Sequence, residues 1–476
     1  MAYRSAVELL ADLDARRVSA RELLELHSDR RDRLDPALNA VVNTDLERAG
    51  RDALRIDEAR ASGRPVGPLA GVPMTVKDGF DVAGMPSVCG VPAFLDRPKD
   101  CPDADVVASA RAAGAVIWGK TNVPSMLSDF QTYNAVYGTT NNPHDPTRTP
   151  GGSSGGAAVA LATGMTALEI GSDIGGSLRH PANFCGVYAL KPTWNQLSMR
   201  GQVPPGPGTF LNMDLGVVGP MARSVADLRL LYRVLRGGPV PPEPAGGEFR
   251  VALWLDEPEF VLSDQVGGPL HRLADELAAS GMAVRPVRPP IAMSSLLGSY
   301  FGLLFSTLMA GSPDGVYQRL LAQRGTAEAE VAAGASRYSM AAFVLSATAS
   351  FRDVQRQRLV RQDIKNAMVD WFRDWDAILA PIGPTPAFTH LQNGVMAERR
   401  LPVDGGEQPY FRLLDWIALA TATHAPAVAV PVGRTESGLP VGVQLIGRWG
   451  EEERLLELAA RIERVTGGFC PPDAAK

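Results

Sequence analysis

Short apolar runs alternate with helix-patterned segments along most of this chain, and this alternation constrains the fold more than any other feature. Three such runs come early: Val72–Val76, Ala115–Gly119 and Thr166–Ile170. A helical pattern over Ala104–Ala113 separates the first two, and another over Ala157–Thr163 precedes the third. Strands that alternate with helices build layers around a mainly parallel or mixed sheet. The sequence therefore predicts an α/β fold in which helices sandwich a central mixed sheet.

The same alternation continues in the second half of the chain. Further strands are predicted over Val187–Leu190, Phe249–Trp254, Ala283–Val287, Ala377–Ala380, Ala427–Val432 and Val441–Ile446, with helices over Pro269–Ser280 and Asp363–Phe372. We expect one domain over residues 1–476. It comprises N-terminal helices (1–65), a core segment (66–236), a variable insert or helical cap (237–350) and a return to the core (351–476).

Composition excludes several classes of protein. The chain is 45% hydrophobic and 21% charged, with a net charge of −5, and it lacks a dense basic run. Nucleic-acid binders usually present a basic face, so no nucleic-acid partner is expected. The four cysteines form no C-x-x-C pair and no metal-type cluster with histidines, so neither a metal nor a cofactor is expected. The N-terminus lacks a signal-peptide pattern, which favours a cytoplasmic location.

One uncharged segment, Pro289–Pro313, raises the question of membrane contact. Its centre, Leu296–Ala310, is strongly apolar and approaches the length that spans a bilayer. Serines and glycines interrupt it, however, at Ser294, Ser295, Gly298, Ser299 and Ser306. A buried or pocket-lining helix fits this pattern better, and no stable membrane insertion is expected.

Two glycine- and serine-rich loops, Gly151–Gly156 and Ser172–Ser177, are the main candidates for chemistry. The first contains G-x-S-x-G, but a nucleophile elbow needs a strand that enters the turn, and Asn141–Pro150 shows no strand pattern. The phosphate-binding pattern G-x-x-x-x-G-K-[ST] is absent as well. Each loop alone is more typical of a turn than of a site.

A serine nucleophile needs a base within hydrogen-bond reach. Lys77 stands at the end of an apolar strand, where burial would lower its pKa and leave the amine neutral. A histidine base is the alternative, and His180 is the histidine nearest to Ser177 in sequence.

Taken together, Lys77 and the two loops resemble the amidase-signature family. Lys77 and both loops occur in the family's order, and Ser153 and Ser177 are 24 residues apart, as its pattern requires. The resemblance covers roughly 65–230 and 355–450. The matching pieces are Gly71–Asp78, Gly119–Asn122, Tyr137–Gly138, Asn142–Pro143, Gly151–Gly156, Asp173–Arg179, Gly186–Pro192 and Gly438–Gln444.

The resemblance implies a role for each residue of the site. Ser177 matches the nucleophile, Ser153 the bridging serine that follows a cis peptide bond, and Lys77 the general base. The family's mechanism forms an acyl-enzyme and uses no metal or cofactor. The resemblance further implies an oxyanion hole built from the N–H groups of Ile174, Gly175, Gly176 and Ser177, and supporting positions at Ser154, Asp173 and Arg179.

The resemblance also leads to an expectation about the substrate. With the apolar segment around Leu296–Met309, the residues Met126, Leu127 and Phe130 predict a hydrophobic pocket. The chain is similar to bacterial aryl acylamidases and broad-specificity amidases, which favours small-molecule aryl or medium-chain acyl amides, with esters and carbamates as extensions. We expect a monomer or homodimer. Ser125–Met126 and Thr421–Pro426 depart from common family residues, in regions expected to shape the substrate pocket.

Two other functions stay open. The amidase subunit of the tRNA-dependent glutamine amidotransferase has the same triad but works with partner chains. Its Tyr-Asp-Gly-rich segment has no counterpart here beyond Ser336–Met340. A catalytically silent binding module is the third possibility, and the presence of Lys77, Ser153 and Ser177 is evidence against it.

Overall fold

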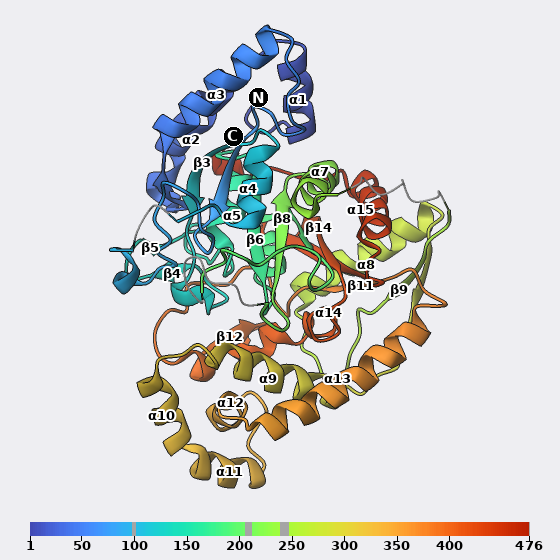
Figure 1. Cartoon of the computed structure of the whole chain (residues 1–476). Coiled ribbons are helices and arrows are strands. Elements are labelled where there is room, and N and C mark those ends of the chain that lie inside the picture. The colour runs from blue at the N-terminus through green and yellow to red at the C-terminus, as the bar shows by residue number, and fades with distance from the viewer. Residues whose placement is uncertain (98–100, 205–211, 239–246, 476) are drawn as a thin grey trace.

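A single eleven-stranded mixed sheet runs through the centre of the molecule (Figure 1). The computed structural model describes residues 1–97, 101–204, 212–238 and 247–475. The strand order is β1-β3-β2-β6-β8-β7-β14-β15-β11-β9-β10. Strands β2, β3 and β6 pair in parallel, as do β9, β10 and β11, whereas the pairs between β6 and β11 are antiparallel. The predicted mixed α/β sheet is confirmed.

The strands of this sheet are short and mostly buried. They are β1 (Val41–Thr44), β2 (Pro73–Lys77), β3 (Val116–Thr121), β6 (Leu168–Asp173), β7 (Tyr188–Lys191), β8 (Val217–Ala222), β9 (Arg250–Leu253), β10 (Ala283–Pro286), β11 (Ala377–Pro381), β14 (Ala427–Arg434) and β15 (Pro440–Gly447). Two hairpins lie outside it: β4 (Tyr133–Asn134) with β5 (Gly138–Thr139), and β12 (Arg400–Val403) with β13 (Gly406–Pro409).

Helices cover both faces of the sheet. Helices α7, α8 and α15 pack on one face, and α5 and α6 pack against its central strands. The helices are α1 (Ala6–Asp14), α2 (Ala20–Leu38), α3 (Leu46–Ala61), α4 (Asp105–Ala112), α5 (Gly155–Ala162), α6 (Arg179–Cys185), α7 (Val225–Arg236), α8 (Asp264–Ala279), α9 (Met293–Met309), α10 (Asp314–Ala322), α11 (Arg324–Ala332), α12 (Met340–Ala347), α13 (Phe351–Trp371), α14 (Ala418–Ala422) and α15 (Glu452–Thr466).

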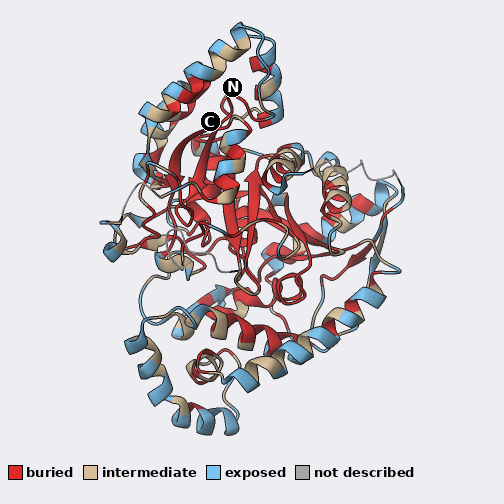
Figure 2. Cartoon of the chain, in the orientation of Figure 1, coloured by how far each residue is buried: buried red, intermediate tan, exposed pale blue. Residues whose placement is uncertain are grey.

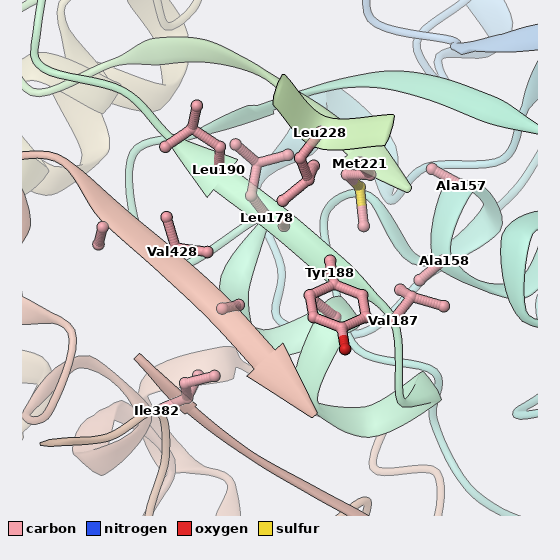
Figure 3. Close-up of a cluster of buried hydrophobic side chains, with 14 of the residues drawn as sticks. Ala157, Ala158, Leu178, Val187, Tyr188, Leu190, Met221, Leu228, Ile382 and Val428 are labelled. Carbon is pink, nitrogen blue, oxygen red and sulfur yellow. The ribbon is translucent and has the colours of Figure 1, made fainter. Parts of the chain in front are cut away.

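The core lies at the middle of the sheet, where both faces are buried (Figure 2). Leu178, which directly follows Ser177, lies among Leu190, Met221 and Leu228 (Figure 3). Its side chain is fully buried. Packing at this density restricts movement of the backbone on either side, so the core fixes the position of Ser177.

The apolar segment near residue 300 forms α9, which packs on α12, α13 and α14 in the lower lobe of Figure 1. Leu296, Leu297 and Tyr300 on this helix are buried. None of the helices in the described part of the chain combines the length and the apolar character that crossing a membrane requires.

Candidate functional site

Lys77 is the last residue of β2, and its amine lies inside the protein. The side chain is fully buried. Its Nζ is 2.8 Å from Ser153 Oγ and 3.0 Å from Ser172 Oγ, the latter at the end of the neighbouring strand β6. The parallel register of β2 and β6 brings the ends of both strands to one edge of the sheet. Lys77 and Ser153, 76 residues apart in the chain, therefore meet as predicted.

Burial changes the proton affinity of this amine. It lowers the pKa of the Lys77 ammonium to about 7, although the nearby Asp173 and Glu169 carboxyl groups favour the charged form. A substantial fraction of the amine is therefore neutral near pH 7. A neutral amine has a lone pair that can accept a proton from a hydroxyl group.

The loop that holds Ser153 is closely packed against its neighbours. The Gly152–Ser153 peptide bond is cis, as the resemblance implied. A Cβ atom at Gly152 would lie 2.6 Å from the carbonyl oxygen of Asp129, so only glycine fits there. The Ser154 N–H donates to the carbonyl oxygen of Ser177 over 3.2 Å, and the Ser154 hydroxyl donates to the carbonyl oxygen of Ser172 over 3.4 Å. These two bonds hold both glycine- and serine-rich loops together.

Ser177 lies between β6 and α6, on a turn that a buried ion pair stabilises. Asp173 accepts hydrogen bonds from the N–H groups of Gly176 (2.9 Å) and Leu178 (3.1 Å) and from the Arg179 guanidinium (3.0 and 3.1 Å). Burial opposes the charge on Asp173, but Arg179 holds the pKa of that carboxyl well below its usual range. The carboxylate therefore stays ionised and closes the turn around Ser177.

Arg179 links this turn to a distant part of the chain. Its guanidinium also donates to the carbonyl oxygen of Ile417 (3.1 Å), to Thr421 Oγ1 (2.7 Å) and to Gln444 Oε1 (3.0 Å). Because every nitrogen of the guanidinium is engaged, Arg179 acts as a rigid structural support, in keeping with the position that the resemblance gave it.

The backbone N–H groups next to Ser177 divide into two sets. The Gly176 N–H is bonded to Asp173, so it is not free to bind a substrate oxygen in this structure. Gly176 has a φ of 90°, and a Cβ atom there would lie 2.4 Å from the His180 ring, so this position requires glycine. Within the described residues, the N–H groups of Ile174, Gly175 and Ser177 have no hydrogen-bond partner. Of the predicted set of four donors, three are therefore not engaged by another described residue.

An apolar pocket opens on one side of Ser177. The predicted residues Leu127 and Phe130 line it. Leu304, Phe305 and Leu308 come from α9, which agrees with the predicted pocket-lining role of this segment. Sequence reasoning missed Met396, Phe411 and Leu414, which also line the pocket.

A second pocket adjoins the first and is lined by both serines. Ser153 and Ser177 share it with the predicted residue Met126 and with Gln202 and Met213. Leu127, Ile174 and Leu308 border both pockets, so the two cavities meet at Ser177. Ser177 is 6% exposed and Ser153 only 1%, which makes Ser177 the more accessible hydroxyl.

A buried ion pair that sequence reasoning did not find supports the apolar pocket. Asp129, on the pocket wall, binds the Arg399 guanidinium at 2.6 Å and accepts hydrogen bonds from the hydroxyls of Tyr133 and Tyr410. Asp129 and Arg399 are 270 residues apart in the chain, and no local pattern relates them. The cluster fixes the loop that carries Leu127 and Phe130.

His180, the alternative base, is engaged elsewhere. Its Nε2 lies 2.9 Å from the carbonyl oxygen of Leu413, and burial lowers the pKa of the ring to about 4. The ring packs under Gly176 instead of contacting the Ser177 hydroxyl. The geometry favours Lys77 over His180 as the base.

Comparisons with known proteins found a matching family model, related sequences and similar solved structures. The model of the family described as Amidase matches residues 22–456. A glutamyl-tRNA(Gln) amidotransferase subunit from Synechococcus sp. (strain CC9605) is 33% identical over 500 residues, covering 97% of this chain and 96% of the relative. A solved crystal structure of an amidase has a TM-score of 0.80 at 30% identity, covering 98% of this chain and 100% of the other. A bacterial aryl acylamidase of the amidase-signature family aligns with a TM-score of 0.78 at 23% identity, over 98% of this chain and 96% of its own, a likeness of fold.

Proposed function

This chain belongs to the amidase family of hydrolases, which cleave the carbon–nitrogen bond of amides, and from this premise we propose that it hydrolyses small amides through an acyl-enzyme on Ser177. The observation that supports this most directly is the contact of 2.8 Å between the buried Lys77 amine and Ser153, in a pocket that Ser177 also lines. An activated serine needs such a base.

In the first half-reaction the neutral Lys77 amine accepts a proton from Ser153, and Ser153 accepts the proton of Ser177. The Ser177 oxygen then attacks the carbonyl carbon of the substrate. The N–H groups of Ile174, Gly175 and Ser177 stabilise the oxyanion, and one such donor typically contributes about 2.7–4 kcal/mol. When the tetrahedral intermediate collapses, the proton returns through Ser153 to the leaving nitrogen, and the amine departs.

In the second half-reaction water replaces the amine. The same relay removes a proton from water, which attacks the acyl carbon, and the proton then passes to the Ser177 oxygen as the acid leaves. The protons balance, because the two half-reactions together add one water across the carbon–nitrogen bond.

The relay also sets the direction in which the substrate binds. The leaving nitrogen must receive its proton from Ser153, so the amine side occupies the pocket with Gln202 and Met213. The acyl side then occupies the apolar pocket with Phe305 and Phe411. This lining supports aryl or medium-chain acyl groups, and esters or carbamates of the same shape are further substrates.

A second candidate is a glutaminase subunit that works with partner chains. The names of the curated relatives support it more strongly than they support a stand-alone amidase. They likewise give no support to the predicted absence of a nucleic-acid partner, since they describe subunits of a glutamyl-tRNA(Gln) amidotransferase. The acyl pocket is evidence for the first candidate, because its described lining holds no cationic side chain for the α-carboxylate of glutamine, and its carboxylate, Asp129, is already paired with Arg399. Burying the charged ends of glutamine unpaired costs several kcal/mol.

One substrate panel distinguishes the two candidates. The purified chain is given butyryl and benzoyl anilides, their matched esters and carbamates, and free glutamine, with Ser177→Ala as the blank. We expect kcat/KM for the apolar anilides to exceed that for glutamine by at least about 100-fold.

A preference for glutamine in this panel would overturn the proposed acyl specificity. An enzyme that a fluorophosphonate labels at Ser177 but that hydrolyses no member of the panel would favour the partner-dependent glutaminase instead.

The Lys77 pKa predicts a pH dependence. Only the neutral amine accepts a proton, so kcat/KM should rise about tenfold per pH unit below pH 7 and level off above it. Glu169, whose pKa burial raises to about 8, titrates in the same range, and Glu169→Gln is therefore the control. The rise near pH 7 should persist in this variant, measured from pH 5 to 9. A profile that is flat in the native enzyme would contradict the assignment of Lys77 as the base.

A further inference from the structure

The outer face of α13 is exposed along most of its length (Figure 2), and three large apolar residues on this helix are strongly exposed. Phe351 is 77% exposed, Leu359 68% and Val369 49%. Phe351 and Leu359 are more exposed than any other large hydrophobic residue in the described part of the chain. Exposed apolar surface is one mark of a docking surface, and on α13 it includes the two most exposed of these residues.

The same helix also carries a pocket that suits one of these side chains. At its C-terminal end, Val369, Phe372, Arg373, Arg448 and Trp449 line an open cavity. Phe351 and Val369 are 18 residues apart, which is five full turns at about 3.6 residues per turn. They therefore lie on the same side of α13, about 27 Å apart along its axis. An exposed aromatic ring and an apolar pocket thus stand at opposite ends of one helix face.

The charges along this face follow the same spacing. Arg352 and Arg356 lie near the N-terminal end of α13. Asp370 lies 18 residues after Arg352, and Asp374, just beyond the end of the helix, lies 18 residues after Arg356. All four side chains are exposed. If two copies of α13 lay side by side in opposite directions, the basic end of each would therefore face the acidic end of the other.

We propose that two copies of this chain associate through α13 in an antiparallel pair related by a two-fold axis near residue 361. Each Phe351 then enters the Val369–Trp449 pocket of the other copy, where aromatic rings and the Arg373 guanidinium surround it. Arg352 and Arg356 of each copy face the acidic end of the other. A two-fold interface uses one surface patch twice, so ring, pocket and charges must be self-complementary, as they are here.

Pairs within the chain do not prevent this arrangement. Arg356 lies 3.8 Å from Asp353, and Arg373 lies 3.1 Å from Asp370, but these side chains are 40–76% exposed. Such surface pairs contribute little stability and can be exchanged for partners across an interface. Asp363 lies near the axis, where the two copies of its exposed side chain can remain in water. A parallel pair, in contrast, would set arginine against arginine.

Replacing the exposed aromatic residue Phe351 is the first test of the proposed dimer. Sedimentation velocity of the full chain should show a dimer at tens of micromolar, and Phe351→Asp should raise the dimer dissociation constant at least about 100-fold, because two anchors are lost per dimer. Leu54→Asp is the control, since it makes the same kind of change at a residue that is 45% exposed on α3. A native chain that stays monomeric at about 100 µM would overturn the proposal, as would a dimer that Phe351→Asp leaves intact.

Charge reversal tests the antiparallel direction. Arg352→Glu with Arg356→Glu should dissociate the dimer, and so should Asp370→Lys with Asp374→Lys, because each leaves like charges opposed. All four changes in one chain should restore the dimer to within about tenfold of the native dissociation constant. Failure of the fourfold variant to dimerise, with its circular dichroism unchanged, would overturn the antiparallel arrangement.

Discussion

Ser177→Ala should lower amide turnover by at least about 10⁵-fold and abolish labelling by a fluorophosphonate probe. The Ser177 hydroxyl is the only group in the proposed mechanism that forms a covalent bond to the substrate, and removal of a catalytic serine in comparable enzymes costs about 10⁶-fold. The change removes one oxygen from a 6% exposed side chain whose backbone is held by Leu178 and Asp173, so the fold should be preserved. Steady-state kinetics and labelling measure the two effects separately.

Ser128→Ala is the matched control for this variant. Ser128 lines the same apolar pocket, and its hydroxyl donates to the carbonyl oxygen of Ser125 instead of facing the proposed relay. We expect its activity to stay within about threefold of the native enzyme. Equal labelling of native protein and Ser177→Ala would place the reactive nucleophile elsewhere and refute the mechanism.

The sequence located the candidate site well because its parts are encoded locally. Lys77 ends an apolar run, and a run of this kind forms a buried strand whose last side chain lies at the sheet edge. Gly152 and Gly176 occupy positions where a Cβ atom would collide with backbone or with a ring. Glycine is therefore required at both positions, and the loops that contain them can be recognised from the sequence alone. Resemblance to a family then supplied what local patterns lack, the meeting of Lys77 with a loop 76 residues away.

Parts of the fold that depend on distant contacts were not predictable. Strand β8 pairs with both β6 and β7, yet Gly219 and Pro220 are poor strand formers. Gly219 is needed there because a Cβ atom would lie 2.0 Å from the carbonyl oxygen of Leu190, a tertiary constraint. Phe411 and Leu414 reach the apolar pocket only through packing of the C-terminal segment.

Helix α13 shows a further limit of periodicity. It begins at Phe351, well before the predicted start at Asp363, and a capping box between Ser350 and Asp353 marks its N-terminus. Only Ile364 and Met368 on this helix are buried, so its hydrophobic period is weak in the first half. The exposed residues that obscured the helix in the sequence are those that the proposed dimer would bury.

Lys77→Met should affect amides far more than esters. It removes the base that activates Ser177 and also the acid that protonates the leaving nitrogen, so amide turnover should fall by about 10⁴-fold or more. A p-nitrophenyl ester with the same acyl group releases a stable phenolate that needs no proton, and its turnover should fall by only about 10²-fold. Methionine fills most of the space of the buried lysine, which limits the loss of packing. Parallel kcat/KM measurements on the anilide and the ester give the ratio.

Lys77→Arg separates proton transfer from simple charge. Arginine keeps a positive charge but stays protonated at every pH used, so it cannot accept the Ser153 proton. We expect it to be as inactive towards the anilide as Lys77→Met. If Lys77 acted only by its charge on Ser153 or on the oxyanion, the arginine would restore much of the turnover. Substantial anilide hydrolysis by Lys77→Arg, or equal losses on ester and anilide in Lys77→Met, would contradict a relay in which one neutral amine first takes the proton and then returns it to the leaving nitrogen.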